Sequence, residues 1–457
     1  MTRVDEGDYR ALDRALIEAL GSWRARCDRL SRMAPWSAPA PVAHDLETSP
    51  LPERLVHVER RAELREHKGD PLAAALVPWV EVLASEDEGY RDRLEVARSL
   101  AELRAIPGRD RELSFSALRR VLLTASHPSV RRLAGDDLGR LGRVIGDVVR
   151  PSLERRIERA RLVPPECRPC AVAELPWNGD GEPPATAVAT RLLDATDDLA
   201  ASFRTGAWEE TLHLAFATRA TEGWPARLGA RWVADVFRGT DVTRRLRLKP
   251  YLPATWGALS YAMAIGGFGA HVLDASRPQT LPFALHQHPL GVRRHVERTL
   301  FASIVAEPAF ALRVLGLGRA RAFDHRREVA RALLVSLRID AWRVVVGAAA
   351  YRGQAALTEA YRDLGERVLG PGLPAELVAL LPLLRPGDGA ALCGALLAAE
   401  RRERLIANFD VDWFANPRAI EELLHDASLA RSPEPLPIER LEAATQRLVT
   451  DLADAIG

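Results

Sequence analysis

The sequence has little cysteine and almost no net charge, and each shortage excludes a class of protein. Four cysteines in 457 residues are too few for the disulfide framework of a secreted protein. The first twenty residues carry charged side chains throughout instead of the apolar core of a signal peptide, so we expect a cytoplasmic protein. The 63 basic and 62 acidic residues leave a formal charge of +1, which predicts no nucleic acid or membrane partner.

Phosphate-binding motifs are also absent. A phosphate loop requires Gly-Lys-Ser/Thr, and neither Lys68 nor Lys249, the only lysines, follows a glycine. The dinucleotide fingerprint requires Gly-x-Gly-x-x-Gly, whereas residues 266–271 read GGFGAH. This stretch lies in the longest uncharged run, 250–273, whose four glycines and two prolines disfavour a membrane span. We interpret it as a buried helix whose small residues let a neighbouring backbone approach closely.

One Cys-x-x-Cys pair is present, and its surroundings argue against a chemical role. A structural zinc site needs four ligands, but Cys167 and Cys170 have no second pair, since Cys27 and Cys393 stand alone. A redox pair is expected between a strand and a helix, whereas prolines flank this one. We therefore expect two inert cysteines in a loop.

Helical periodicity dominates the rest of the sequence. Phe115, Leu118 and Leu122 fall on one apolar stripe, which predicts an amphipathic helix. Asn416 before Pro417 predicts a helix start, because asparagine caps the free N–H groups and proline fits the first position. Strand-like alternation is scarce, so we predict a mainly α fold with little β structure.

Two proline-rich stretches predict how the chain is divided. The first, in VPPECRPCAVAELPWNGDGEPPATA, separates two helical regions, and RSPEPLP at 431–437 precedes the last helix. We predict four parts, which are an N-terminal helical region at 1–163, a linker at 164–187, a middle helical region at 188–249 and a C-terminal region at 250–457.

Four segments follow one another in the second half of the chain: SYAMAIGGFGAHVL, QTLPFALHQHPLG, RRHVERTLFASIVAEPAF and FDVDWFANPRAIEELL. Their order resembles the oligoendopeptidase F and thimet-oligopeptidase family of zinc metallopeptidases. The similarity covers roughly residues 190–457. It implies a multi-helix peptidase-like fold with a central channel or groove, in which the N-terminal region is lid-like.

The catalytic motif of that family is missing. The family's His-Glu-x-x-His supplies two zinc ligands and a general base from one helix, and a glutamate from the next helix completes the site. None of the eleven histidines here is followed by Glu, and the last tyrosine, Tyr361, precedes the stretch where the family's substrate-positioning tyrosines belong. The degenerate site and possible groove lining that the resemblance implies comprise Gly266, Gly267, Ala270, His271, His295 and Glu297.

Three functions remain open from the sequence. The first hypothesis is a catalytically inactive metallopeptidase relative, without metal or cofactor, that binds a peptide or protein partner in a helical groove. The second is a metal-dependent hydrolase in which His286, His288 and His295 are the ligands, because a His-x-His loop plus a residue of the next helix can leave one coordination position open. The third is a helical scaffold unrelated to peptidases.

Overall fold

The predicted mainly α fold is confirmed. The structure is a computed structural model, and its described residues form fifteen α-helices and no strand. An isolated β-bridge joins Val172 and Leu175. The described residues are 6–31, 51, 55, 57–102, 104, 106, 108, 110, 112–204, 206–216, 236–237, 258–278, 280–380, 385–429 and 433–457.

The first half of the chain contains seven described α-helices. They are α1 (Glu6–Ser31), α3 (Val58–Glu66), α4 (Pro71–Glu102), α5 (Phe115–Thr124), α6 (Pro128–Leu162), α7 (Pro184–Ala201) and α8 (Trp208–Phe216).

The second half contains eight more described α-helices. They are α11 (Ala258–Ala275), α12 (Arg293–Ser303), α13 (Pro308–Arg313), α14 (Arg319–Ala350), α15 (Gln354–Leu369), α16 (Asp388–Phe409), α17 (Pro417–Ser428) and α18 (Ile438–Ile456). Five short 3-10 helices join the described elements, and these are η1 (Pro165–Cys167), η2 (Phe283–Leu285), η3 (Ile304–Ala306), η4 (Ala375–Leu380) and η5 (Trp413–Ala415).

Local sequence signals explain where two of these helices begin. The Ser114 side chain accepts a hydrogen bond from the Ala117 N–H at 3.2 Å and caps α5, whose predicted apolar stripe is buried. Asn416 accepts from the Arg418 N–H at 3.0 Å and caps α17, with Pro417 at the first position as predicted. Both caps satisfy backbone donors that a helix start leaves free.

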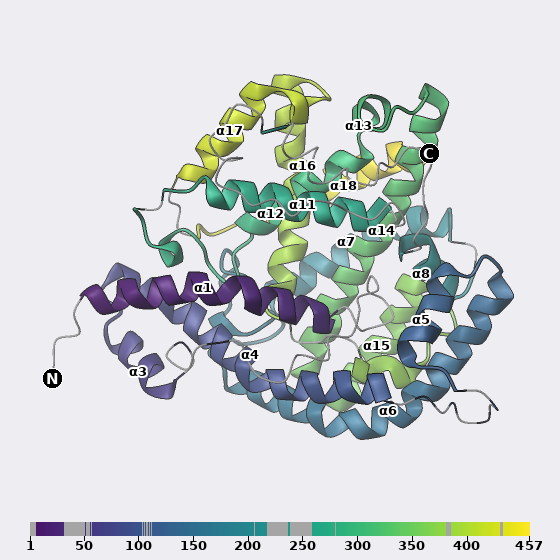
Figure 1. Ribbon diagram of the computed structural model, residues 1–457, viewed down its shortest axis with the longest axis horizontal. Coiled ribbons are helices and arrows are strands. Elements are labelled where there is room, and N and C mark those ends of the chain that lie inside the picture. Colours follow the sequence, from purple (N-terminus) through teal and green to yellow (C-terminus); the bar gives the residue numbers. More distant parts are fainter. Residues whose placement is uncertain are drawn as a thin grey trace.

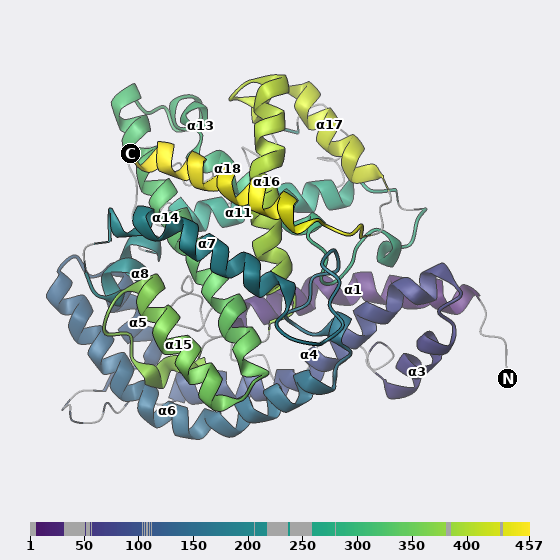
Figure 2. The ribbon, with the colours of Figure 1, turned by 180° about the vertical axis from the view of Figure 1, so that it is seen from behind.

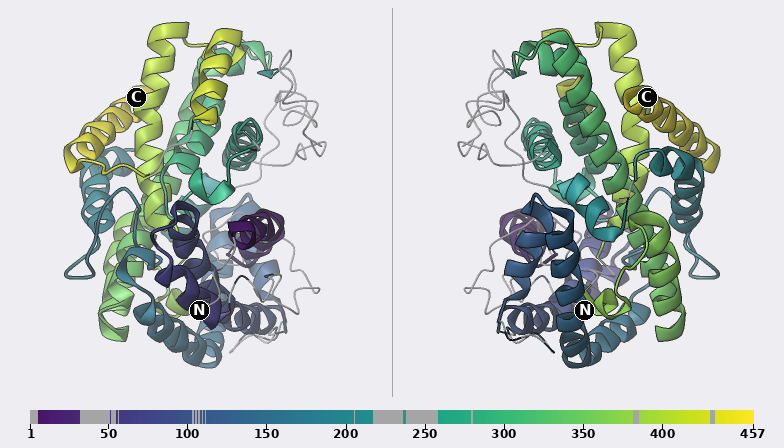
Figure 3. Two further views of the ribbon diagram at one scale, coloured as in Figure 1. Left: turned by 90° about the vertical axis from the view of Figure 1, so that its left-hand side faces the viewer. Right: turned by 90° about the vertical axis from the view of Figure 1, so that its right-hand side faces the viewer.

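The long helices are arranged in layers. Helix α1 crosses one face of the molecule (Figure 1), and α7 and α18 cross the opposite face (Figure 2). Helices α4 and α6 pack on each other along one edge. Helix α16, drawn in yellow-green, extends through much of the height of the molecule (Figure 3) and contacts α7, α12, α17 and α18.

The main hydrophobic core draws on all the predicted parts of the chain. It contains Leu76 from α4, Leu192 from α7 and Leu396 from α16, and it includes Val172 and Leu175 from the predicted linker. A second core lies around α11, α12 and α17. The helices therefore share cores across the predicted boundary at 163–187, while the boundary at 249 and 250 lies outside the described residues. None of the described helices combines the length and apolarity that a bilayer crossing requires.

Candidate functional site

A cavity of about 660 Å³ opens between α4, the loop that precedes α12, α12 itself, α16 and residues 433–436. This volume lies within the range of about 300–1,000 Å³ that is usual for small-molecule sites. Part of the wall is apolar, and it includes Ala74, Ala75, Pro78, Leu285, Val292, Val296, Leu397 and Leu436. The polar part of the wall consists of Glu174, His286, Gln287, His288, Arg293, Arg294, Glu400, Arg401, Arg404, Asp426, Glu434 and Arg440.

The loop that carries His286 and His288 is held from two sides. The Asp13 carboxylate of α1 accepts hydrogen bonds from the backbone N–H groups of Phe283 and Ala284, both at 2.8 Å. From α4, the Trp79 indole N–H donates to the Gln287 carbonyl at 2.8 Å. Because these partners come from helices distant in sequence, the position of the two histidines depends on the packing of α1 and α4.

A buried carboxylate fixes the start of α12 and the last wall of the cavity. Both carboxylate oxygens of Glu174 accept from the Val292 N–H, at 3.0 and 3.1 Å, and so satisfy a free donor at the helix N-terminus. Burial raises the pKa of Glu174, although this hydrogen bond opposes the shift. The Leu436 N–H donates to the Glu174 carbonyl at 2.7 Å, which holds the segment 433–436 beside the cavity.

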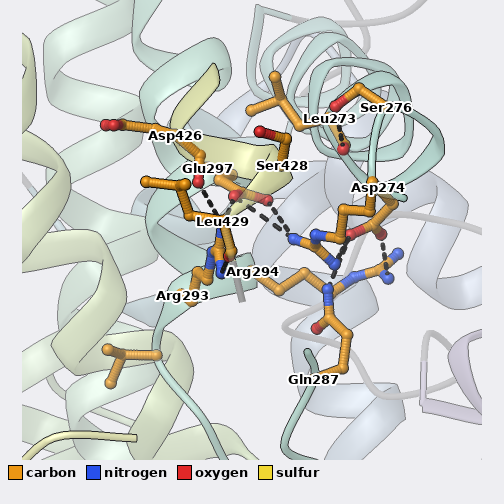
Figure 4. Close-up of polar contacts among 12 residues, drawn as sticks. Leu273, Asp274, Ser276, Gln287, Arg293, Arg294, Glu297, Asp426, Ser428 and Leu429 are labelled. Atoms are coloured by element: carbon orange, nitrogen blue, oxygen red, sulfur yellow. Dashed lines mark hydrogen bonds and ion pairs between the residues drawn. The ribbon is translucent and has the colours of Figure 1, made fainter. Parts of the chain in front are cut away.

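An ion-pair network lies behind the arginines of the cavity (Figure 4). Gln287 and Arg294 both point toward Asp274, which accepts from the Gln287 amide at 2.8 Å and from the Arg294 guanidinium at 2.5 Å. Glu297 is 1% exposed and lies 3.3 Å from Arg277 and 3.6 Å from Arg293. Burial raises the pKa of Glu297, and the neighbouring arginines oppose that shift. The network thus holds the first turn of α12 in a fixed position.

Two arginines in the wall also hold the end of α17. Arg293 donates to the carbonyls of Leu429 and Asp426 at 2.9 and 2.6 Å, where the helix leaves acceptors free. The Arg401 terminal nitrogen Nη2 pairs with the Asp426 carboxylate at 3.0 Å. Its Nε–H, also buried, has no hydrogen-bond partner among the described residues.

His286 is the most unusual group in the wall. Its side chain is buried, with 4% of the residue exposed, and neither ring nitrogen has a hydrogen-bond partner in the described part of the chain. Burial lowers the pKa of His286, and the charges of Arg277 and Arg293 lower it further against the opposing effect of Asp13. The ring is therefore neutral at pH 7, with one donor and one acceptor both unpaired.

His288 lines the same cavity and is also neutral. Burial lowers its pKa to about 4. The Leu290 N–H donates to Nδ1 at 3.1 Å, so the single proton of the neutral ring lies on Nε2. No described residue accepts a hydrogen bond from Nε2, which leaves a second N–H donor unpaired in the wall.

The structure places the predicted degenerate site in a helix contact. A Cβ added at Gly266 would overlap with the carbonyl oxygen of Arg298 on α12, and one at Gly269 would overlap with the Phe301 ring. The expectation that small residues allow close backbone approach is therefore confirmed. Ala270 is buried beside them, whereas Gly267 and His271 are exposed.

The two remaining residues of that predicted site lie on α12. His295 faces α16, where a Cβ added at Gly394 would lie 2.5 Å from the His295 Cβ. Glu297 belongs to the ion-pair network described above. The cavity wall contains none of the six predicted positions Gly266, Gly267, Ala270, His271, His295 and Glu297.

The alternative metal site does not form among the described residues. In that part of the chain, no three His, Cys, Asp or Glu side chains lie together so that they could hold a metal ion. His286 and His288 line the cavity, whereas His295 packs against α16, with its Nε2 near Gly387. The Nδ1 lone pair of His288 is also engaged by the Leu290 N–H. The prediction of His286, His288 and His295 as ligands of one ion is therefore wrong.

The Cys-x-x-Cys pair lies at one end of the short helix η1. Both thiols are buried, and burial raises the pKa of Cys167 to about 12 and that of Cys170 to about 11. Both are thus protonated at neutral pH, which makes them poor nucleophiles and metal ligands.

Sequence reasoning singled out His286 and His288 as metal ligands but missed the cavity and its arginines. No motif marks these residues, because they come from segments around 75, 174, 290, 400 and 435. A scan of protein-family models and searches of curated proteins and of solved structures found no match to this chain. The resemblance to the oligoendopeptidase F and thimet-oligopeptidase family therefore stays a prediction.

Proposed function

We propose that this chain is a binding protein that holds a small organic molecule or a short peptide in the cavity without cleaving it. The observation that carries the proposal is the buried His286, whose two ring nitrogens have no partner among the described residues. Buried polar groups in native proteins nearly always have hydrogen-bond partners. A bound ligand that supplies these partners accounts for both the cavity and the histidine.

The absence of cleavage in this proposal rests on α11. In the metallopeptidase family that the sequence resembles, one helix carries two zinc ligands and a general base, and the resemblance places Gly266, Gly267 and Ala270 at those positions. Gly266 lies against the backbone of α12, where an imidazole has no room. Descent from a metallopeptidase is thus compatible with a binding function that uses a different part of the fold.

A cavity-filling variant tests the binding site. Ala74 is exposed in the cavity wall, so a tryptophan there extends into the cavity without displacing the core. Ala355, exposed on α15 away from the cavity, provides the matched control. The probes are a panel of N-acetylated dipeptides, each with a free and an amidated C-terminus, and the readout is the melting temperature.

We expect at least one probe to raise the melting temperature of the wild type and of Ala355→Trp, because a ligand that binds only the native state stabilises it. The same probe should leave Ala74→Trp unchanged. If no probe stabilises the wild type, or if stabilisation survives in Ala74→Trp, the proposal fails.

A second measurement tests the absence of hydrolysis. We expect purified protein incubated with zinc and a quenched fluorescent peptide to release no product above a blank. If the protein binds stoichiometric zinc and cleaves the peptide, and if a chelator abolishes the cleavage, this part of the proposal is wrong. The protein would then be a metal-dependent peptidase.

A further inference from the structure

The unpaired polar groups of the cavity are mostly donors. His288 offers the Nε2–H, Arg401 offers the buried Nε–H, and His286 offers one N–H and one acceptor nitrogen. These groups thus comprise three hydrogen-bond donors and one acceptor. A ligand that satisfies them must be rich in acceptor oxygen atoms.

The charges of the wall disfavour a ligand that carries more than one negative charge. Five arginines and four carboxylates line the cavity, and both histidines are neutral near pH 7. Most of the arginines are already paired with carboxylates, as Arg440 is with Glu400 at 3.0 Å. Arg293 and Arg294 are paired with Glu297 and Asp274 behind the wall, so the site holds no excess of positive charge, and a monoanion is easier to accommodate there than a phosphate dianion.

The rest of the wall is suited to an apolar group. Ala75, Val296 and Leu397 come from three different helices, and Leu436 contributes from the segment held by Glu174. Burial of an apolar ligand body against such side chains is favourable in proportion to the area removed from water.

We propose that the cavity recognises a carboxylate carried on an apolar body, with His286, His288 and Arg401 as its hydrogen-bond donors. This inference rests on the proposed function and specifies its ligand class. A carboxylate oxygen that accepts from these N–H groups forms charge-assisted bonds, which are stronger than those of a neutral amide oxygen. Both a peptide C-terminus and a medium-chain fatty acid have this chemistry.

Calorimetric titration at pH 7.5 separates the carboxylate from the rest of the ligand. The probes are N-acetyl-phenylalanyl-leucine and octanoate, each compared with its own amide, which has the same apolar body without the charge. We expect the acid of at least one pair to bind about tenfold or more tightly than its amide, as for hydrogen bonds to a charged group. The pair that shows this difference identifies the ligand as a peptide C-terminus or an acyl chain.

Variants locate the donors. His286→Phe removes both unpaired nitrogens, keeps a ring of similar size and is expected to fold, because no protein hydrogen bond is lost. We expect it to weaken binding of the acid about tenfold and to leave the amide unchanged. Arg401→Met provides a second test of the same expectation. His271→Phe is the matched control, since His271 is exposed outside the cavity, and it should bind like the wild type.

Three outcomes would overturn the inference in distinguishable ways. If acid and amide bind equally and Ala74→Trp abolishes both, the carboxylate preference is wrong while the cavity remains the binding site. If acids bind but Ala74→Trp has no effect, the proposed site itself is wrong. If neither acid binds the wild type, the carboxylate ligand class is wrong. The proposed function is then decided by the amidated dipeptides of the melting-temperature panel.

Discussion

The backbone of Gly266 on α11 lies so close to the carbonyl oxygen of Arg298 on α12 that any side chain at position 266 would overlap with it. A backbone carbonyl cannot turn aside as a flexible side chain can. The glycine therefore determines how closely the two helices pack. It also explains why a metal-binding imidazole has no place at this position of the present fold.

Gly266→Ala should destabilise the protein by about 1–3 kcal/mol, because α12 must shift to admit the methyl group. The control is Gly267→Ala, one residue along the same helix, where a Cβ meets open space. This control should stabilise by about 0.5–1 kcal/mol through helix propensity. Urea unfolding of both variants measures the difference. Equal effects of the two substitutions would show that α11 and α12 do not pack this closely.

Glu209 on α8 should make stability depend on pH. Its carboxyl group is buried against Gly135 of α6, and burial raises its pKa from 4.5 to about 7, with a further contribution from Asp136 against the opposing Arg132. The folded state therefore holds a proton that the unfolded state releases above pH 4.5. Stability contributed by this group is present below pH 4.5 and falls as pH rises through about 7.

Glu209→Gln removes this titration. We expect the variant to be more stable than the wild type at pH 8 by about 2–3 kcal/mol, and to differ little from it at pH 4.5. Melting temperatures across this range provide the measurement. If the wild type is more stable than Glu209→Gln at pH 8, the fold stabilises the ionised carboxylate, contrary to this expectation.

Arg338 on α14 joins its own helix to α7 and α15, since it also donates to the Arg367 carbonyl on α15 at 3.1 Å. Its side chain is 1% exposed and donates to the Leu193 carbonyl at 3.1 Å, to the Thr196 hydroxyl at 2.7 Å and to the Asp197 carboxylate at 2.8 Å. Arg338→Met removes this donor from the buried Leu193 and Thr196 oxygens on α7, while Asp197 keeps Arg367 as a partner, and we expect a loss of about 2–4 kcal/mol in denaturant unfolding.

The control for this prediction is Arg362→Met on α15. Among the described residues, Arg362 pairs with its exposed neighbour Asp363 alone, so its loss should have no measurable effect. If Arg338→Met proves as stable as the wild type, hydrophobic packing alone joins these helices.

Asp13 on α1 should control the order of the loop that carries the cavity histidines. Its carboxylate accepts from the N–H groups of Phe283 and Ala284 without lining the cavity. In Asp13→Ala, we expect hydrogen exchange of residues 283–288 to become faster and ligand binding to weaken. Asp8→Ala, which in the described part of the chain removes an exposed pair with Arg60 and no other, should change neither. Unchanged exchange in Asp13→Ala would show that other contacts hold the loop.

Local patterns in the sequence were enough to predict the helical class, the stripe of α5, the cap of α17 and the close backbone approach on α11. The first three depend on residues within a few turns of one another, so spacing and side-chain type determine them. The glycines of α11 indicated the close approach, although the partner Arg298 is distant in sequence. One of the three hypotheses from the sequence also named His286 and His288, as metal ligands. It grouped them with His295, which the packing of α12 on α16 instead directs away from the cavity.

The cavity itself was decided by the tertiary structure alone. Its wall combines Ala74, Glu174, His286, Arg401 and Leu436, which are brought together only when α4, α12 and α16 pack and the C-terminal segment crosses them. Burial and partner geometry then determine that both histidines are neutral and that their N–H groups have no partner in the described part of the chain. Such properties depend on which atoms surround a side chain, and neighbours in sequence do not specify those atoms.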